Sequence, residues 1–260
     1  MFNILKIKLT EQQIYSTSKD KFCVIIPTYN NASKIEEVIK GVLTHSQNII
    51  VVNDGATDNT EIILGKFKEI VVVSYSKNKG KGYALKQGFK KALELGFNYA
   101  ITIDSDGQHS ASEIPEFVKT CNNQKGSLII GARTTINGNV PRKNSFANKF
   151  SNLWVLIITG IKLTDTQSGY RLYPLNKMQN IKFISRRYEF ELEVLAKASW
   201  RNIPIISIPI SVFYPPNNER ITHFRPFVDF LRISLLNSWL VFLGLAIYRP
   251  LNIIKNLIRK

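Results

Sequence analysis

The sequence predicts an α/β domain built on a mostly parallel central sheet with helices on both of its faces. Short β-branched apolar runs alternate with stretches of helical spacing about every 25 residues between Lys21 and Arg133. Such alternation is typical of βαβ units, whose crossover helices cover both faces of a parallel sheet. Hydrophobic residues make up 44% of the 260-residue chain and charged residues 21%. These ordinary globular values exclude a disordered chain, a collagen-like repeat and a polytopic membrane protein.

The first half of the chain supplies five predicted strands, at 22–27, 48–53, 70–75, 99–104 and 127–133. A helix over 32–43 follows from the apolar spacing of Ile35, Val38, Ile39 and Val42. Further helices are predicted after Thr57, as an N-cap, and over 82–95 and 110–121. Ligands of parallel sheets bind outside the carboxyl ends of the strands, so chemistry is expected just after 27, 53, 75, 104 and 133.

The second half is less regular and defines the predicted domain boundaries. Helices are expected over 144–163 and 188–198, and a strand over 203–214 whose prolines favour an edge position. The segment 215–220 reads as a turn. We therefore expect an N-terminal extension over 1–20 without signal-peptide features, a catalytic domain over 21–215 and a distinct tail over 216–260.

Charge is the one abnormal property of the composition. Lys and Arg number 35 against 19 Asp and Glu, a formal net charge of +16. This excess implies an anionic partner, which is a nucleic acid, a phosphorylated substrate or an acidic membrane face. The two cysteines, Cys23 and Cys121, exclude a disulfide framework and a Cys-rich zinc site, and we expect reduced structural thiols in a cytoplasmic protein.

The fourth predicted strand ends in Asp104-Ser105-Asp106. Two carboxylates one residue apart at the mouth of a parallel sheet are well placed to hold a divalent cation. Hard oxygen ligands suit Mg²⁺ or Mn²⁺, which keep waters and bridge to substrate phosphates. The alternative is a surface turn with two solvated acids.

Other strand ends carry weaker signals. Asp54 is suited to accept a hydrogen bond from a nucleoside, or only to cap the following helix. Tyr29 either stacks on a base or covers the edge of the sheet. The glycines around Lys81 form neither a dinucleotide fingerprint, because Leu85 replaces its third glycine, nor a P-loop.

Together the segments IIPTYN, VVNDGATDNT, GKGYALKQG, ITIDSDGQH and GAR, in this order, resemble glycosyltransferase family 2, over about residues 21–213. The segments DSDGQHSASEIPEF, DTQSGYRLYP and YEFELEVLAKA are similar to the dolichol-phosphate mannosyltransferase branch of that family. The resemblance implies a GT-A fold, a Rossmann-like sheet, here followed by an apolar helical tail.

The resemblance also implies roles for individual residues. The donor nucleotide would be bound by Pro27, Tyr29, Asn31, Asn53, Asp54, Lys81 and Asp104. The metal ligands would be Asp104, Asp106 and Gln108. The catalytic group would be Asp104, Asp106, Arg133, Arg171 and Asp165, with both arginines facing phosphate groups. Asn31 stands where the family usually has Glu, and Asn53 where it usually has Asp, which leaves a GDP-linked or a UDP-linked donor open.

The expected chemistry is stabilisation of a nucleoside diphosphate leaving group. A metal at Asp104 and Asp106 would neutralise its charge, and the arginines would add charge-assisted contacts. A hydroxyl acceptor needs a base, for which Asp165, Glu189 and Glu191 are candidates, although each is equally read as a solvated or helix-capping acid. A lipid phosphate needs none. It is favoured by basic residues on the presumed acceptor side: Arg133, Arg142, Lys143, Lys149, Arg171, Arg186 and Arg187.

The sequence lacks the Q-x-x-R-W element that processive synthases of the family carry, so a single transfer is expected. The predicted function is an inverting, metal-dependent, non-processive transfer of one sugar to a lipid-linked acceptor, a polyprenyl (dolichol-like) phosphate. A first alternative is transfer to a saccharide or glycolipid hydroxyl in cell-surface polysaccharide assembly. A second is a non-catalytic nucleotide- or nucleic-acid-binding module, which no RNA-binding motif supports.

The tail combines seven Lys or Arg with two acids and an apolar run over 233–248. Sixteen helical residues span roughly 24 Å, short of the ~30 Å hydrocarbon core of a bilayer. We therefore expect an interfacial or re-entrant segment anchored by Trp239 and Tyr248, and a cytoplasmic protein held at the inner face of the membrane. A packed C-terminal helix or a homodimer contact is the alternative, and no nucleic-acid partner is expected.

Overall fold

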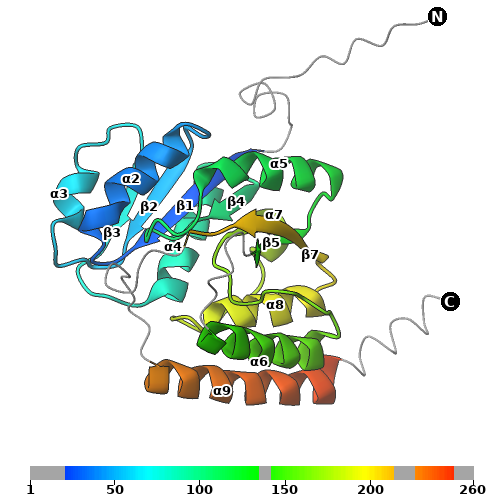
Figure 1. Cartoon of the computed structure of the whole chain (residues 1–260). Coiled ribbons are helices and arrows are strands. Elements are labelled where there is room, and N and C mark those ends of the chain that lie inside the picture. Colours follow the sequence, from blue (N-terminus) through cyan, green and yellow to red (C-terminus); the bar gives the residue numbers. More distant parts are fainter. Residues whose placement is uncertain (1–20, 135–141, 214–225, 249–260) are drawn as a thin grey trace, which may run out of the picture.

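The computed structural model describes residues 21–134, 142–213 and 226–248. Seven strands form one sheet in the order β3-β2-β1-β4-β6-β5-β7 (Figure 1). Their bounds are Phe22–Thr28 (β1), Ile49–Asn53 (β2), Val71–Ser74 (β3), Tyr99–Thr102 (β4), Leu128–Thr134 (β5), Arg171–Pro174 (β6) and Ile205–Ser211 (β7). The predicted extension over 1–20 and the predicted turn over 215–220 lie outside the described residues.

The sheet is mostly parallel, as predicted. Strand β1 pairs in parallel with β2 and β4, β2 with β3, and β5 with β7. The exception is β6, which runs antiparallel between β4 and β5 and was not predicted. Its four residues, RLYP, begin with a charge and end with proline, so they lack the apolar run by which the other strands are detected. The predicted edge position of β7 is confirmed.

Helices cover both faces of the sheet, and alternate strand residues point to opposite faces. In β1, Cys23 and Ile25 pack with α4 (Lys81–Glu94), α7 (Leu175–Met178) and α8 (Phe190–Trp200). Val24 and Ile26 pack with α2 (Ala32–Leu43), α3 (Thr60–Leu64) and α5 (Ile114–Asn123), which follows the short helix η1 (Ala111–Glu113). Because both sides are covered, the inner strands β1, β2 and β4 are buried along their length and read as apolar runs, whereas the edge strands β3 and β7 are partly exposed.

The start of α3 differs from the prediction. Thr57 is not its N-cap, because its backbone N–H donates to Asn30 Oδ1 at 2.7 Å in the loop after β1. The N-cap is Asn59, whose side chain makes no capping bond, and the preceding Asp58 accepts a hydrogen bond from Thr60 N at 3.0 Å. The same carboxylate accepts from Ala32 N at 3.0 Å, so it joins the starts of α2 and α3.

The described part of the tail forms α9 (Pro226–Leu243) and a short π-helical turn (Gly244–Tyr248). Figure 1 shows α9 lying against α6 (Arg142–Thr159) below the sheet. Leu236 and Leu240 are buried there with Ile158 of α6, and Trp200 of α8 stacks on Tyr248 at 4.1 Å between ring centroids. The stretch Leu231–Tyr248 is long and apolar enough to cross a membrane by length and composition, and only 18% of it is buried. One side of the helix is thus packed and the other is open.

Candidate active site

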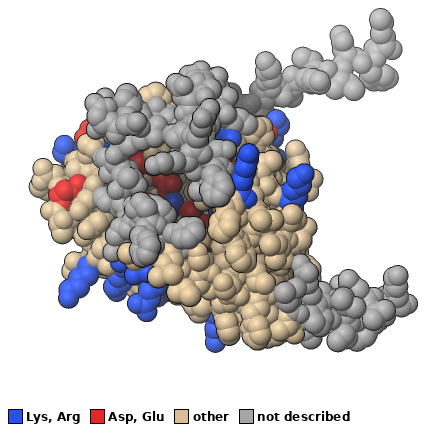
Figure 2. Space-filling view, turned by 60° about the horizontal axis from the view of Figure 1, so that its bottom comes forward, with Lys and Arg blue, Asp and Glu red and all other residues tan. Residues whose placement is uncertain are grey.

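The ends of β1 and β4 meet at one place on the carboxyl edge of the sheet. Asn31 Nδ2 donates to Ser105 Oγ at 2.8 Å, so the loop after β1 holds the centre of the Asp104-Ser105-Asp106 turn. Asn31 and Ser105 are both buried. In Figure 2, acidic and basic side chains lie together in a recess on the face turned toward the viewer. The predicted convergence of polar groups at this edge is therefore present.

Asp54 holds the loop that follows β3. Its Oδ1 accepts from Lys79 N at 2.7 Å, and its Oδ2 accepts from Gly80 N at 2.8 Å and from Asn78 Nδ2 at 3.0 Å. The side chain is buried at the end of β2 and does not cap the following helix. A nucleoside contact of Asp54 stays a prediction, but its structural work is to position residues 78–80.

The remaining predicted nucleoside residues lie along the same edge. Asn53 Oδ1 accepts from Ala56 N at 2.9 Å, which shapes the turn after β2. Pro27 is paired opposite Val52 near the end of β1. Tyr29 is half-buried in the next loop. Their contact with a donor stays a prediction.

Lys81 lies between two carboxylates at the start of α4. Its Nζ is 2.7 Å from Asp104 Oδ1 and 2.9 Å from Glu191 Oε1. Burial lowers the pKa of Lys81, but the two carboxylates outweigh burial and raise it above the ordinary value. Burial likewise raises the pKa of Asp104, and the charge of Lys81 more than reverses this, so the carboxyl stays ionised.

The two acids of the turn are electrostatically unequal. Burial, and then the charge of Asp104, raise the pKa of Asp106 to about 6. Asp106 Oδ1 accepts from Gln108 N at 3.0 Å. The described residues hold no group of three or more His, Cys, Asp or Glu that would form a complete protein shell for a metal. Two hard carboxylates fit Mg²⁺ or Mn²⁺, which complete their shells with water and substrate phosphate.

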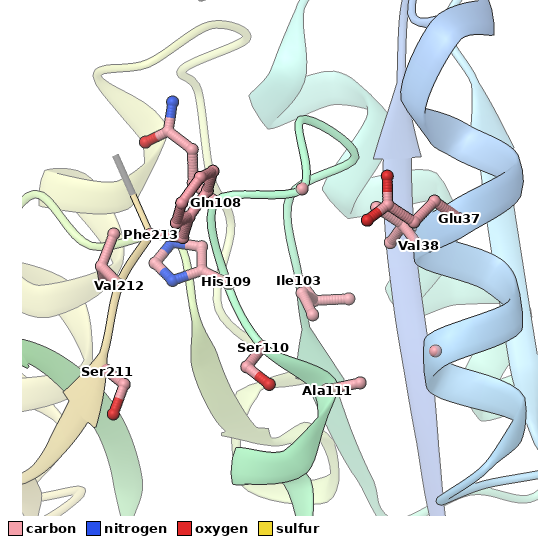
Figure 3. A pocket seen from close by; sticks show the side chains of 12 residues that line it. Glu37, Val38, Ile103, Gln108, His109, Ser110, Ala111, Ser211, Val212 and Phe213 are labelled. Atoms are coloured by element: carbon pink, nitrogen blue, oxygen red, sulfur yellow. The ribbon is translucent and has the colours of Figure 1, made fainter. Parts of the chain in front are cut away.

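A cavity of about 510 Å³ adjoins this turn between α2, residues 107–111 and the end of β7 (Figure 3). The side chain of Gln108 lines it, so the role of Gln108 as a third metal ligand stays a prediction. His109 also lines it and packs against Tyr170 at 5.2 Å between ring centroids. Burial lowers the pKa of His109 to about 4, so its imidazole is neutral at pH 7. Sequence reasoning missed this cavity, because it joins segments more than 60 residues apart.

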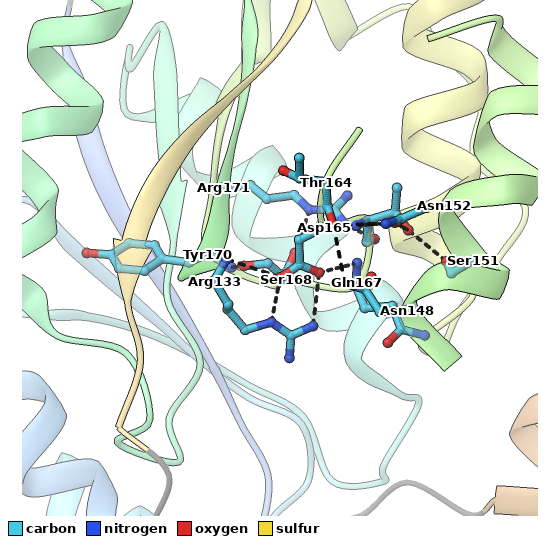
Figure 4. Close-up of polar contacts among 11 residues, drawn as sticks. Arg133, Asn148, Ser151, Asn152, Thr164, Asp165, Gln167, Ser168, Tyr170 and Arg171 are labelled. Atoms are coloured by element: carbon cyan, nitrogen blue, oxygen red, sulfur yellow. Dashed lines mark hydrogen bonds and ion pairs between the residues drawn. The ribbon is translucent and has the colours of Figure 1, made fainter. Parts of the chain in front are cut away.

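Arg133 and Asp165 form a bidentate ion pair (Figure 4). Arg133 Nε donates to Oδ2 at 2.5 Å and Nη2 to Oδ1 at 2.9 Å, and the carboxylate also accepts from the backbone N–H of Arg133 and Gln167. Burial raises the pKa of Asp165, but its bonds to Arg133 outweigh burial and lower it. A general base needs a pKa near the operating pH, so this arrangement argues against Asp165 as the base.

The structure contradicts the predicted role of Arg171, which was expected to face a phosphate group. Its side chain is fully buried and donates to three backbone carbonyls. Figure 4 draws Arg171 beside one of these partners, Ser168. Nε bonds Ser168 O at 2.7 Å, Nη1 bonds Glu191 O at 2.8 Å, and Nη2 bonds Thr166 O at 2.8 Å. Because β6 lies in the middle of the sheet, this side chain points into the protein and does not face an open phosphate site.

The other candidate bases are also engaged. Glu189 Oε1 accepts from the backbone N–H of Arg187 at 3.2 Å and of Arg186 at 3.4 Å, at the start of α8, and Glu191 is paired with Lys81. A second cavity, of about 450 Å³, lies beside them and carries four cationic side chains, Lys79, Arg186, Arg187 and Arg232. The side chains of Arg142 and Lys143 lie outside the described residues.

A mostly parallel sheet with an acid pair at its carboxyl edge is the arrangement expected of a GT-A glycosyltransferase. The family model for glycosyl transferase family 2 matches residues 23–182, and the chain belongs to this family. The predicted family and fold are thereby confirmed.

Among curated relatives is the UDP-N-acetylglucosamine–dolichyl-phosphate N-acetylglucosaminyltransferase of Methanococcus voltae, 31% identical over 214 residues, with 74% of this chain and 85% of the relative covered. Another is the polyprenol monophosphomannose synthase of Mycolicibacterium smegmatis, 26% identical over 202 residues, with 72% and 76% covered. Among solved structures, glucosyl-3-phosphoglycerate synthase from Mycobacterium tuberculosis in complex with Mn²⁺, UDP and glucosyl-3-phosphoglycerate superposes with a TM-score of 0.67. It is 17% identical, with 94% of this chain and 86% of that chain covered. It supports the fold.

Proposed function

We propose that this enzyme transfers one sugar from a nucleoside-diphosphate sugar to a polyprenyl (dolichol-like) phosphate, with inversion and without processivity. The observation that carries the proposal is the Asp104–Asp106 turn at the carboxyl edge of the sheet. The relatives, a transferase to dolichyl phosphate and a polyprenol monophosphomannose synthase, support this class of acceptor.

In this proposal Asp104 and Asp106 hold Mg²⁺ or Mn²⁺. Such a cation, when bound, neutralises the charge that develops on the departing diphosphate. Arg133 is fixed at the end of β5 by Asp165, so its guanidinium is a preorganised cation near the strand ends. Preorganised charge of this kind is commonly the largest catalytic contribution. Lys81 and Asp104 lie on the side of the proposed donor site that would face the diphosphate.

The nucleoside side of the proposed site consists of Pro27, Tyr29, Asn31, Asn53 and Asp54. Asn31 and Asn53 are amides, so they offer hydrogen bonds to a base or ribose without adding negative charge beside the diphosphate. Asp54 fixes the backbone of Lys79 and Gly80 just before α4. A GDP-linked and a UDP-linked donor both fit these properties, and a donor panel decides between them.

An anionic acceptor is supported by charge near the tail. The basic cavity includes Arg232 of α9, and the open side of that helix exposes apolar side chains, among them Leu231 and Trp239. A phosphate bound near such a helix would have its lipid chain beside an apolar surface. We propose residues 21–215 as the catalytic domain and 216–260 as a membrane-associating unit at the inner face of the membrane. A homodimer stays a prediction.

The deciding experiment offers the purified full chain, with Mn²⁺ or Mg²⁺, a panel of GDP- and UDP-sugars and three acceptors: a polyprenyl phosphate, the matching free polyprenol and a saccharide. We expect transfer to the polyprenyl phosphate and none to the polyprenol. Transfer to the saccharide alone would establish polysaccharide assembly instead. Tight RNA binding with no nucleotide-sugar binding would establish a binding module.

A further inference from the structure

Lys81, Asp104 and Glu191 form a buried ion cluster whose members come from three separate elements. Lys81 begins α4, Asp104 follows β4, and Glu191 lies in the first turn of α8. The ammonium is shared almost equally, at 2.7 Å from one carboxylate and 2.9 Å from the other. The side chains expose 17%, 25% and 9% of their surfaces, respectively. A cation therefore already occupies one oxygen of a proposed metal ligand.

Gly169 forms the wall of this cluster. A Cβ at residue 169 would lie 2.5 Å from Lys81 Nζ and 2.6 Å from Asp104 Oδ2, closer than non-bonded atoms approach. The φ angle of Gly169 is not in the left-handed region, so an added Cβ would be opposed by close approach, and the ends of the Lys81 and Asp104 side chains would have to shift. Thr102 Oγ1 donates to Gly169 O at 2.6 Å and fixes the wall against β4.

Arg171 fixes the loop before Gly169 and the backbone of Glu191 relative to each other. It bonds the carbonyls of Thr166 and Ser168, just before Gly169, and the carbonyl of Glu191. Any shift of the loop or of α8 relative to the sheet breaks at least one of these bonds. The buried arginine thus fixes the backbones around Lys81, and the ammonium has two defined carboxylates and little other room.

We propose that Lys81 is a positioning residue that acts as an internal counter-cation for Asp104: it competes with the divalent cation for this carboxylate, and Glu191 takes the ammonium when the metal binds. The proposal rests on the proposed metal site. Because the carboxylates of Asp104 and Glu191 lie at nearly equal distances from Lys81 Nζ, the ammonium can pass from one to the other with little movement. Without Glu191, the ammonium has only Asp104 to bind.

This arrangement predicts opposite effects of two neutralising substitutions on metal affinity. Lys81→Met removes the competitor, so Mn²⁺ binds about tenfold more tightly or better, because a like charge beside the site is lost. Glu191→Gln leaves the ammonium on Asp104, so Mn²⁺ binds about tenfold more weakly. The double variant is expected to bind Mn²⁺ about as tightly as Lys81→Met, because Glu191 acts through the ammonium that Lys81→Met has already removed. At saturating Mn²⁺, Lys81→Met still turns over more slowly, because Asp104 has lost its orientation.

The measurement is the Mn²⁺ dissociation constant of the full chain by electron paramagnetic resonance, without donor, alongside kcat at saturating Mn²⁺. Lys90→Met is the matched control. Lys90 lies on the same helix, α4, and its exposed side chain pairs with Glu94 at 4.0 Å, so the Mn²⁺ affinity of this variant is expected to equal wild type. Lys81→Arg keeps the charge and is expected to retain weak Mn²⁺ binding. Melting curves confirm that each variant is folded.

Unchanged or weaker Mn²⁺ binding by folded Lys81→Met overturns the inference, as does unchanged binding by Glu191→Gln. If Lys81→Met fails to fold, the Mn²⁺ affinity of Glu191→Gln is compared with that of Lys81→Arg. Weaker Mn²⁺ binding by Glu191→Gln supports the inference, and equal binding overturns it. A wild type that transfers sugar with Mn²⁺ while these affinities do not diverge refutes the inference alone. A wild type that neither binds Mn²⁺ nor transfers sugar refutes the metal-dependent function itself.

Discussion

The two halves of the sheet edge hold their polar side chains in different ways. In the loops after β1, β2 and β4, Asn31 and Asp54 bond neighbouring loops, and Asn53 bonds within its own turn. A cavity lined by residues 107–111 adjoins the acid pair. In the segment around β6 and α8, Arg171 and Asp165 are buried and bound by several partners each. The first region is arranged around an opening, whereas the second is arranged around the backbone. A charged residue in a motif therefore adjoins a cavity in one region and supports the interior backbone in the other.

The sharpest test of the first region is Asp106→Asn. The change is nearly isosteric and removes one charge from the turn, so we expect a loss of transfer of roughly 10³-fold, in the range of removing a preorganised electrostatic contact. The melting temperature should not fall, because the raised pKa of Asp106 shows that its charge is unfavourable where it lies. The rate is measured with the donor and acceptor identified in the panel. Wild-type transfer by this variant would remove the acid pair from the mechanism.

Arg171→Met tests the second region and should act through stability. It leaves three buried carbonyls without their donor, and each unsatisfied group costs about 1–3 kcal/mol, so we expect a loss of about 3 kcal/mol or more in the free energy of unfolding. Denaturant unfolding measures this loss. Arg171→Lys should recover only part of it, because one ammonium cannot reproduce the fork of the guanidinium. A variant of unchanged stability that loses only donor or acceptor binding would restore the phosphate role for Arg171.

What the sequence could predict follows the same division. The strands of the first region read correctly because each is an apolar run covered on both faces, and the predicted helix over 32–43 matches α2 residue for residue. Strand β6 escaped prediction because Arg171 occupies an interior position, which no periodicity of apolar residues reveals. The pairing of Asp165 with Arg133 escaped as well, since 32 residues separate the partners. Local patterns identify strand ends, but burial of charge depends on long-range contacts.

Gly169→Ala probes the point where the two regions touch. Its Cβ would overlap Lys81 Nζ and Asp104 Oδ2, and overpacking of this kind costs about 1–3 kcal/mol. We expect a lower melting temperature together with reduced transfer, because Asp104 must move. Gly65→Ala is the control, since a Cβ there has no neighbour closer than 3.5 Å and belongs to an exposed turn. If Gly169→Ala and Gly65→Ala had the same melting temperature and the same rate of transfer, the neighbours of residue 169 would accommodate a Cβ without cost.

The smallest expected difference is in the pH dependence of stability. Glu193, in the second region, is fully buried and accepts from Lys197 and from the backbone N–H of Ile184 and Ser185. Burial raises the pKa of Glu193, but these bonds outweigh burial and lower it below the ordinary value of about 4.3. A lowered folded-state pKa gives stability that is fully present above that value and is lost as the pH falls through the folded-state pKa.

Glu193→Gln should therefore flatten the fall in unfolding free energy below about pH 4.3, besides lowering stability at pH 7. Burial raises the pKa of Asp58 in the first region, but the hydrogen bonds that it accepts from Thr60 and Ala32 together outweigh burial and lower it. Asp58 lies near water, which screens its charge, so Asp58→Asn should change the acid limb much less. Urea unfolding between pH 3 and 7 compares the two. A larger effect at Asp58 would mean that charge supports the backbone as strongly at the open edge as in the interior.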